Sequence, residues 1–341
     1  MKVLIFTDNH FCRSSSILNR LGNKYFERIE NQLNSLNWLE NKATELNCDE
    51  VWCLGDFFNK PDLNEDEITA LRDIKWNSLP HKFLVGNHES AQGDLKYTSV
   101  KVFENPQFEI INKIKIIEVN NTKIAFLPYF SEQTRPNISE AVGKVDIILS
   151  HNDLAGINFG PIVSTIGFNQ DDILDNCKLF INGHLHNGSW IKKNRILNLG
   201  SLTGQTFGED AFKFAHNIAI LDTDSLEVTL IENPYAYNFY KIEINNLLDL
   251  NQIKKLKNNA VLSIKCNEKF IDKLNEQLNL FKDKIINYRV VQTRDKLDIA
   301  NNQTTNTIDL SVNPTEKFIE LCKIKFTNDE VLFEELAEIC K

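Results

Sequence analysis

Short apolar runs separated by polar segments recur along the first two thirds of the chain. They are rich in Val, Ile, Leu and Phe, which is typical of strands buried on both faces. Strands are expected at residues 2–7, 50–54, 82–85, 145–150, 178–182 and 195–199. Between the first two, apolar residues from Ile29 to Leu46 recur at steps of three and four, the spacing of one helix face. Strand, helix and strand in alternation predict a layered α/β core.

The pattern changes in the later part of the chain. Residues 108–126 predict a hairpin that turns at Asn120-Asn121, and residues 212–244 predict a β meander that turns at residues 223–225. A small β-α-β unit is expected over residues 260–292, followed by an Asn- and Thr-rich linker and two short amphipathic helices. The predicted domains are therefore 1–240, 241–295, a linker at 296–314 and a helical tail at 315–341.

Composition restricts the class of protein. The 341 residues are 42% hydrophobic and 25% charged, as in ordinary globular proteins, and no apolar run reaches the length of a membrane span. The first apolar run ends at Asp8, too early for a signal peptide, and the seven Cys form no CxxC pair. These features predict a cytoplasmic protein with no membrane partner. The formal net charge of −9 argues weakly against a nucleic-acid partner.

Metal-ligand residue types follow five of the expected strands. They occur as Asp8-Asn9-His10, Gly55-Asp56, Gly86-Asn87-His88-Glu89, His151 and Gly183-His184-Leu185-His186. In open α/β sheets, ligands bind outside the carboxyl ends of the strands, where these residues fall. Five of the seven histidines lie in these motifs, and only His81 and His216 lie elsewhere. For those two histidines, and for Asp153 in its local turn, a structural role is expected.

The residue types predict a site for two divalent cations. Carboxylate, imidazole and amide groups suit Mn²⁺ best here, with Mg²⁺, Fe or Zn²⁺ as alternatives, and the absence of paired thiolates argues against structural zinc. Two ions roughly 3.5–4 Å apart can clamp the attacking and leaving oxygens of a displacement at phosphorus. Glycines at 55, 86 and 183 precede ligands where the chain must bend away from a strand.

The ordered motifs D-x-H, G-D, G-N-H-E, H and G-H-x-H resemble the calcineurin-like metallophosphoesterase superfamily. Within it the chain is similar to the SbcD-type DNA repair exonucleases, and most similar to the recombination endonuclease subunit of T-even bacteriophages. Two segments carry this finer resemblance, Gly55-Asp56-Phe57-Phe58 and Asn198-Leu199-Gly200-Ser201-Leu202. The resemblance implies an α/β fold: a four-layer β-sandwich flanked by helices, with a small β-α-β capping domain and a C-terminal helical tail.

The resemblance also implies a role for each motif residue. One ion would be held by Asp8, His10 and His186. The other would be held by Asn87, His151 and His184. Asp56 would bridge both ions.

His88 would donate a proton to the leaving oxygen, and Asn9 and Glu89 would orient ligands from behind. Relatives usually carry a second histidine three residues after the bridging aspartate, but this sequence has Asn59, which cannot supply a proton. Glu89 likewise replaces a more usual Asp. The change at position 59 leaves endonuclease action open.

The implied function is a metal-dependent DNA exonuclease, or also endonuclease, that acts in recombination and repair. Its implied partners are DNA and an SbcC-like coiled-coil ATPase, which would dock on the C-terminal helices. The helix over residues 29–46 could support a homodimer. Two alternatives stay open: a phosphoesterase acting on nucleotides or phosphoproteins, because the motifs specify a reaction and not a substrate, and a non-enzymatic scaffold.

Overall fold

The structure, a computed structural model, describes residues 1–294 except residues 16, 19, 92 and 160–161. The predicted linker at 296–314 and the predicted helical tail at 315–341 lie outside the described residues.

One six-stranded sheet contains the strands that begin the chain. Strands β1, β2, β3 and β6 are parallel and end at the β6 edge; on the other side β15 pairs antiparallel with β1, and β16 pairs antiparallel with β15. In spatial order the strands are β16 (Glu227–Glu232), β15 (Asn217–Asp222), β1 (Lys2–Phe6), β2 (Glu50–Cys53), β3 (His81–Leu84) and β6 (Phe108–Ile111).

A second six-stranded sheet also contains four adjacent parallel strands, but these are its central strands. Strands β14, β12, β9 and β8 are parallel, and an antiparallel strand closes each edge. In spatial order the strands are β13 (Ser189–Lys192), β14 (Ile196–Asn198), β12 (Leu179–Asn182), β9 (Ile147–Ser150), β8 (Thr122–Leu127) and β7 (Lys115–Val119).

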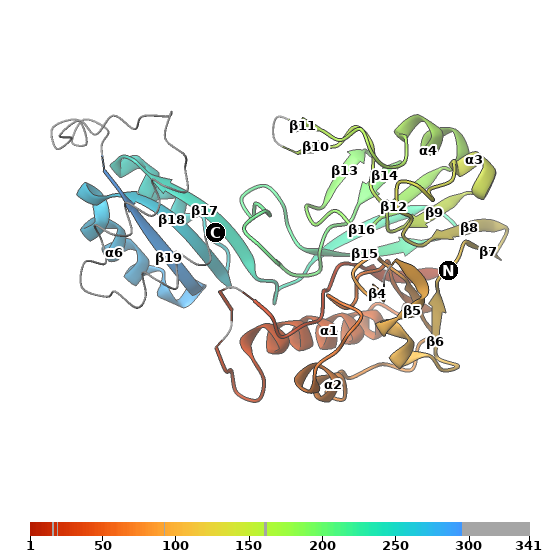
Figure 1. Ribbon diagram of the computed structural model, residues 1–341, viewed down its shortest axis with the longest axis horizontal. Coiled ribbons are helices and arrows are strands. Elements are labelled where there is room, and N and C mark those ends of the chain that lie inside the picture. The colour runs from red at the N-terminus through yellow and green to blue at the C-terminus, as the bar shows by residue number, and fades with distance from the viewer. Residues whose placement is uncertain (16, 19, 92, 160–161, 295–341) are drawn as a thin grey trace, which may run out of the picture. The chain divides into compact units, whose positions relative to one another are not determined.

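Alternation along the strands builds the layers, because successive side chains of a strand point to opposite faces. In β1, Val3 and Ile5 join the apolar core between the two sheets, whereas Leu4 and Phe6 join the core beneath α1 (Glu27–Glu45). The far face of the second sheet packs with α3 (Ile138–Ala141) and α4 (Gln170–Asn176). Helix, sheet, sheet and helix give the four layers seen in Figure 1. The predicted α/β sandwich is confirmed.

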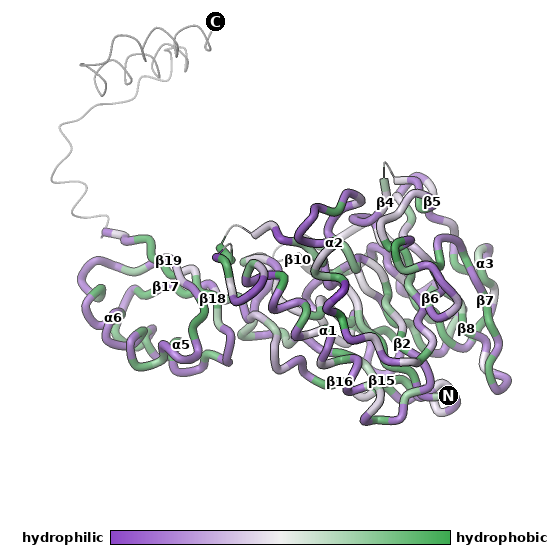
Figure 2. Tube along the Cα trace, turned by 90° about the horizontal axis from the view of Figure 1, so that it is seen from below, coloured by the Kyte–Doolittle hydropathy of each residue, from purple (hydrophilic) through white to green (hydrophobic). Residues whose placement is uncertain are grey.

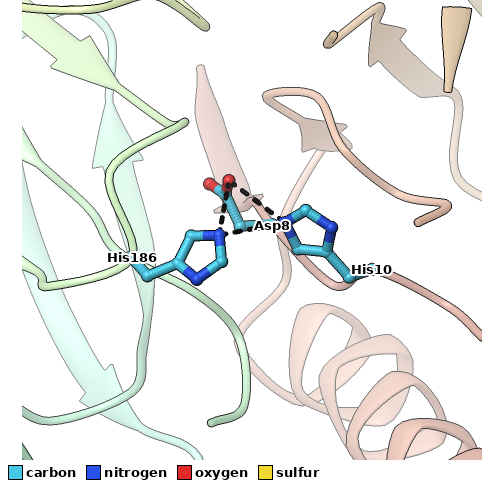
Figure 3. A group of neighbouring side chains, drawn as sticks. All are labelled: Asp8, His10 and His186. Carbon is cyan, nitrogen blue, oxygen red and sulfur yellow. Dashed lines mark hydrogen bonds and ion pairs between the residues drawn. The ribbon is translucent and has the colours of Figure 1, made fainter. Parts of the chain in front are cut away.

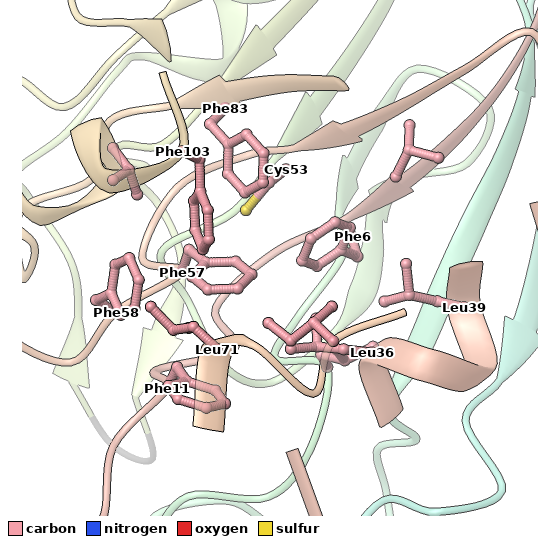
Figure 4. Close-up of a cluster of buried hydrophobic side chains, with 14 of the residues drawn as sticks. Phe6, Phe11, Leu36, Leu39, Cys53, Phe57, Phe58, Leu71, Phe83 and Phe103 are labelled. Atoms are coloured by element: carbon pink, nitrogen blue, oxygen red, sulfur yellow. The ribbon is translucent and has the colours of Figure 1, made fainter. Parts of the chain in front are cut away.

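The core beneath α1 is rich in phenylalanine. Helix α1 alternates hydrophobic and hydrophilic residues along its length (Figure 2), and its buried face includes Leu36 and Leu39. Phe57 is fully buried in this core, with its ring centroid 5.4 Å from Phe83 and 5.2 Å from Phe103 (Figure 4). Phe57 follows Asp56 directly, so this packing anchors the loop after β2. Burial of one such ring stabilises the fold by about 1.5–3 kcal/mol.

Two predicted β regions differ from the structure. The hairpin turn at Asn120-Asn121 is present between β7 and β8, with both residues at positive φ. However, β6 at the start of the predicted hairpin pairs with β3 in the other sheet. Likewise β15 and β16 form the expected antiparallel pair, but β17 (Asn238–Ile244) leaves the predicted meander for a third sheet. Apolar runs indicate strands without identifying their partners, which distant parts of the chain decide.

The third sheet has three parallel strands, β17, β18 (Ala260–Asn267) and β19 (Ile285–Thr293). Helix α6 (Ile271–Leu280) connects the last two strands and packs Leu274 and Leu278 into their core. The remaining short elements are α2 (Glu65–Leu71), β4 (Ser90–Ala91), β5 (Asp94–Thr98), η1 (Ser99–Phe103), β10 (Asn158–Phe159), β11 (Ile162–Val163), η2 (Leu247–Leu250), α5 (Asn251–Lys254), η3 (Glu268–Phe270) and η4 (Lys282–Lys284).

Candidate metal centre

The predicted ligands leave the carboxyl ends of five parallel strands. In the first sheet Phe6, Cys53 and Phe83 are aligned neighbours at the ends of β1, β2 and β3. In the second sheet Ser150 and Asn182 are aligned at the ends of β9 and β12. The loops that follow therefore begin at matching levels of each sheet, and their side chains converge.

The backbone is strained at several of these positions. Asp8, His10, Asp56 and His184 have φ of 51°, 47°, 50° and 76°, a region that residues other than glycine rarely occupy. Such strain clusters at functional sites, where the surrounding structure enforces it. The expected bend at Gly55 is present, with φ of 99°. At position 86 glycine is required by space, because a Cβ there would collide with the backbone and carboxylate of Asp56.

A first cluster joins Asp8, His10 and His186 (Figure 3). The two rings approach the Asp8 carboxylate from opposite sides, with their Nε2 atoms 3.8 and 3.9 Å from Oδ1. The two Nε2 atoms lie 3.0 Å from each other. These are the residues that the sequence assigned to the first ion.

A second cluster joins Asp56, His151 and His184. His151 Nε2 lies 3.1 Å from Asp56 Oδ2, and His184 Nδ1 lies 3.0 Å from Asn87 Oδ1. Asp56 also lies 3.7 Å from His10 Nε2 of the first cluster, between the two groups. The structure thus brings together the four residues expected around the second ion and places Asp56 where a bridge is expected.

The four imidazoles share one pattern of hydrogen bonding. Each ring places one nitrogen within hydrogen-bond distance of a protein acceptor outside the clusters and turns the other toward a carboxylate or Asn87, where it would present a lone pair to a bound cation. The outer bonds are His10 Nδ1 to Asn59 Oδ1 (3.1 Å), His151 Nδ1 to the Leu54 carbonyl (2.6 Å), His184 Nε2 to Asp153 Oδ1 (3.1 Å) and His186 Nδ1 to Glu209 Oε1 (3.0 Å).

The inward-facing atoms fit cations. Asp8 Oδ1 is buried without a hydrogen-bond partner among the described residues, and His151 Nε2 faces only the Asp56 carboxylate there, at 3.1 Å. With its Nε2 donating to Asp153, His184 presents an acceptor to the Asn87 oxygen, another acceptor. Buried acceptors that face each other are costly unless a positive charge lies between them. Oxygen and imidazole nitrogen donors, with no thiolate, suit divalent metals such as Mn²⁺, Mg²⁺, Fe or Zn²⁺.

Electrostatics at the site favour positive charge. Burial opposes ionisation of Asp8, but the nearby His151, His10 and His186 outweigh it and lower the pKa of Asp8 to about 2. The pKa of Asp56 is lowered further, since His151 outweighs the effect of burial. Burial also opposes the charge on His151, yet Asp56 and Asp8 raise its pKa to about 9. Asp8 and Asp56 are thus two buried, negatively charged carboxylates, and a divalent cation bound between them would neutralise that charge.

Glu89 ties two of the ligand loops together. Its carboxylate accepts backbone hydrogen bonds from Gly86 (2.8 Å), Asp56 (3.2 Å) and Phe58 (3.1 Å). Burial, and then the charge of Asp56, raise the pKa of Glu89 to about 8. Glu89 therefore connects the loops after β2 and β3 from the buried side of the site.

His88 is the exposed histidine of the site. Its backbone N–H donates to Asp56 Oδ1 at 3.0 Å, and its Nδ1 donates to the Asn59 carbonyl at 3.2 Å. The ring stands edge-on to His10, with the centroids 4.7 Å apart. The Nε2 atom is thereby left for a ligand. Asn59 itself positions two histidines, through its side chain on His10 and its carbonyl on His88.

Sequence reasoning did not identify two positioning residues. Glu209 lies in a loop with no motif of its own, and it also accepts the Gln205 N–H at 3.0 Å. Asp153 was expected to serve only its local turn, yet it bonds His184 and pairs with Arg135 at 3.3 Å. The side chain of Asn9, expected behind the ligands, is buried and has no hydrogen-bond partner among the described residues.

The two histidines outside the motifs have structural contacts. His81 donates from Nδ1 to the Leu79 carbonyl at 2.8 Å and faces Glu40 at 3.1 Å. His216 donates from Nδ1 to the Ser201 carbonyl at 2.9 Å. Both are buried and neither belongs to the two clusters, although His216 Nε2 lies 3.9 Å from the Glu209 carboxylate that holds His186.

None of the described helices combines the length and apolar character that crossing a bilayer requires.

Comparison with known proteins gives one informative match. The sequence model described as calcineurin-like phosphoesterase matches residues 1–188, which include every predicted ligand. No curated protein matches the chain.

Three of the solved structures that match this chain have low sequence identity and TM-scores of 0.40 or less. A Thermus thermophilus protein is 9% identical, with 68% of this chain and 98% of that chain covered and a TM-score of 0.40. A metallophosphoesterase from Sphaerobacter thermophilus is 14% identical, with 68% and 88% covered and a TM-score of 0.31. A protein of unknown function from Aquifex aeolicus is 19% identical, with 56% and 81% covered and a TM-score of 0.27.

Proposed function

The chain belongs to the calcineurin-like phosphoesterase family, and from this premise we propose that it is a metal-dependent DNA nuclease. Family membership implies a hydrolase that uses divalent metals on phosphoesters. The observation that carries the proposal is the arrangement of four imidazoles, each fixed from outside, around Asp8 and Asp56. Such a preorganised pair of clusters suits a phosphodiester held between two cations.

The proposed division of ligands follows the two clusters. The first cation would be held by Asp8, His10 and His186. The second would be held by Asn87, His151 and His184. Asp56 would contact both, since it lies 3.7 Å from His10 and 3.1 Å from His151. Bound there, the cations, most simply Mn²⁺, supply charge neutralisation at phosphorus and a nucleophile at neutral pH.

His88 is the proposed general acid. It is exposed beside the clusters, and the bond from Nδ1 to Asn59 orients the ring with Nε2 outward. A protonated Nε2 can donate to the leaving oxygen as the phosphodiester bond breaks. Asn59 holds the ring but supplies no proton, so one histidine performs this role alone.

The choice of DNA as substrate rests on the finer sequence resemblance to SbcD-type nucleases. The small parallel sheet of β17, β18 and β19 follows the two large sheets in the chain, in the order in which the resemblance implies a capping domain. The proposed ATPase-binding helices fall outside the described residues. The net charge of −9 predicts that DNA binding by the isolated chain is weak and falls steeply with salt.

A nucleotide or phosphoprotein phosphoesterase is the competing proposal. The net charge of −9 favours it, because a small substrate needs fewer cationic contacts than DNA does. Relative turnover of DNA, cyclic nucleotides and phosphopeptides by the same preparation separates the two proposals.

The direct test is nucleotide release from linear duplex DNA by the purified chain, with Mn²⁺ or with EDTA, and with or without an SbcC-like ATPase. Cleavage is expected only with the metal. His88→Ala is expected to lower the rate roughly 10²–10⁴-fold, whereas the exposed Lys101→Ala serves as a control that retains activity. Absence of DNA cleavage under every condition, with rapid turnover of a small phosphodiester, would favour the competing proposal.

A further inference from the structure

A buried arginine borders the metal centre without a part in any step described above. Arg28 lies in the first turn of α1 and is only 4% exposed. It lines a cavity of about 450 Å³ that His10, Asn59, His88 and His186 also line. Arg28 and the proposed general acid therefore line one cavity.

The guanidinium of Arg28 is incompletely bonded. Among the described residues its one hydrogen bond runs from Nη1 to the Gly204 carbonyl at 3.3 Å, and Nε is buried without an acceptor. No carboxylate oxygen of the described residues lies within 4.0 Å of it. Arginine is rarely buried unless a negative charge accompanies it. The missing counter-charge points to an anionic ligand.

The cavity is suited to an anion in other respects. None of the described residues that line it is Asp or Glu, although the chain as a whole carries a net charge of −9. Ser14 and Thr206 add hydroxyl groups to the lining. A substrate anion in this cavity would be attracted by the charge of Arg28. No carboxylate among the described lining residues would repel it.

We propose that Arg28 binds a second phosphate of the substrate, next along the strand to the phosphodiester held at the metal centre. This inference rests on the proposed function and narrows it to substrates with consecutive phosphates, as in a polynucleotide. A planar guanidinium matches two phosphate oxygens at once, which a lysine ammonium does not. Arg28 thereby favours the binding of polynucleotide strands over that of isolated phosphodiesters.

The test uses a short DNA strand and two analogues in which a neutral methylphosphonate replaces one or the other phosphate flanking the scissile bond. In the wild-type protein, one analogue is expected to lower kcat/KM roughly 10- to 100-fold, the effect of losing a charged hydrogen-bonded pair. In Arg28→Gln the ratio of kcat/KM on the unmodified DNA strand to kcat/KM on the sensitive analogue is expected to fall close to 1. The matched control is Arg72→Gln, an exposed arginine that is expected to keep the wild-type ratio.

Arg28→Lys keeps the charge and provides a second variant, with an expected ratio between those of the wild type and Arg28→Gln. The wild-type ratio needs no variant, so loss of folding cannot mask the result. Equal rates on strand and analogues, or an unchanged ratio in Arg28→Gln, would overturn the inference and leave the nuclease proposal standing. Turnover of bis-p-nitrophenyl phosphate without cleavage of any strand would refute the proposed function, and this inference with it.

Discussion

Each histidine of the two clusters has one ring nitrogen bonded to a protein acceptor and the other directed at Asp8, Asp56 or Asn87. The clustering of these Asp, His and Asn residues was predictable from the sequence, because the motifs follow strands whose carboxyl ends must meet. The acceptors that bond the outer nitrogens of the histidine rings were harder to predict from the sequence. Glu209 reaches His186 only through the fold, and no local pattern marks it.

Glu209 gives a prediction at this scale. Its carboxylate holds His186 with Nε2 facing Asp8, so Glu209→Gln removes charge and weakens the orientation of a ligand. We expect Mn²⁺ affinity at the first cluster to fall roughly 10- to 100-fold, the usual effect of losing such a partner. Calorimetric titration measures it, with the exposed Asp171→Asn as control. Unchanged affinity would mean that Glu209 does not position His186.

At the scale of elements, the central strands β1, β2, β3, β9 and β12 begin and end close to their predicted bounds. Their continuous apolar character is sufficient evidence, since both faces are buried. The hairpin over residues 108–126 was only partly right, because β6 pairs with β3 instead of β7. An apolar run of four residues indicates a strand but not its neighbour, and the parallel order depends on contacts distant in sequence.

The C-terminal end of α4 gives a prediction on pH. Cys177 is buried there, its thiol donates to the Ile173 carbonyl at 3.3 Å, and burial raises its pKa to about 12 from an ordinary value of 9.0. Between these values the unfolded chain loses the thiol proton and the folded chain keeps it. The free energy of unfolding therefore falls as pH rises from 9 toward 12, by up to about 1.4 kcal/mol per pH unit, because the stability that the protonated Cys177 thiol confers is lost.

Urea unfolding at several pH values under reducing conditions measures this dependence. Cys177→Ala removes the titrating group, so its stability is expected to fall less steeply than that of the wild type between pH 9 and 12. Parallel pH dependences for the two proteins would show that the thiol does not contribute.

For the whole molecule, the two six-stranded sheets bring candidate ligands from residues 8–186 together, although those residues are far apart in sequence. The sandwich was predictable because strands, helix and motifs agree with one family. The position of Arg28 beside His88 was not, since a single arginine in an amphipathic helix carries no such signal. The chain is acidic overall, whereas the cavity that His88 lines also contains Arg28, a buried cation with no carboxylate within 4.0 Å among the described residues.

The central claim, a site for two divalent cations around Asp56, is tested most directly by titrating metal-free protein with Mn²⁺ in a calorimeter. The account predicts two ions bound per chain. Because Asp56 lies between both clusters, Asp56→Asn is expected to weaken both binding events, whereas Asp171→Asn keeps them. Binding of a single ion, or of none, by the wild-type chain would contradict the account.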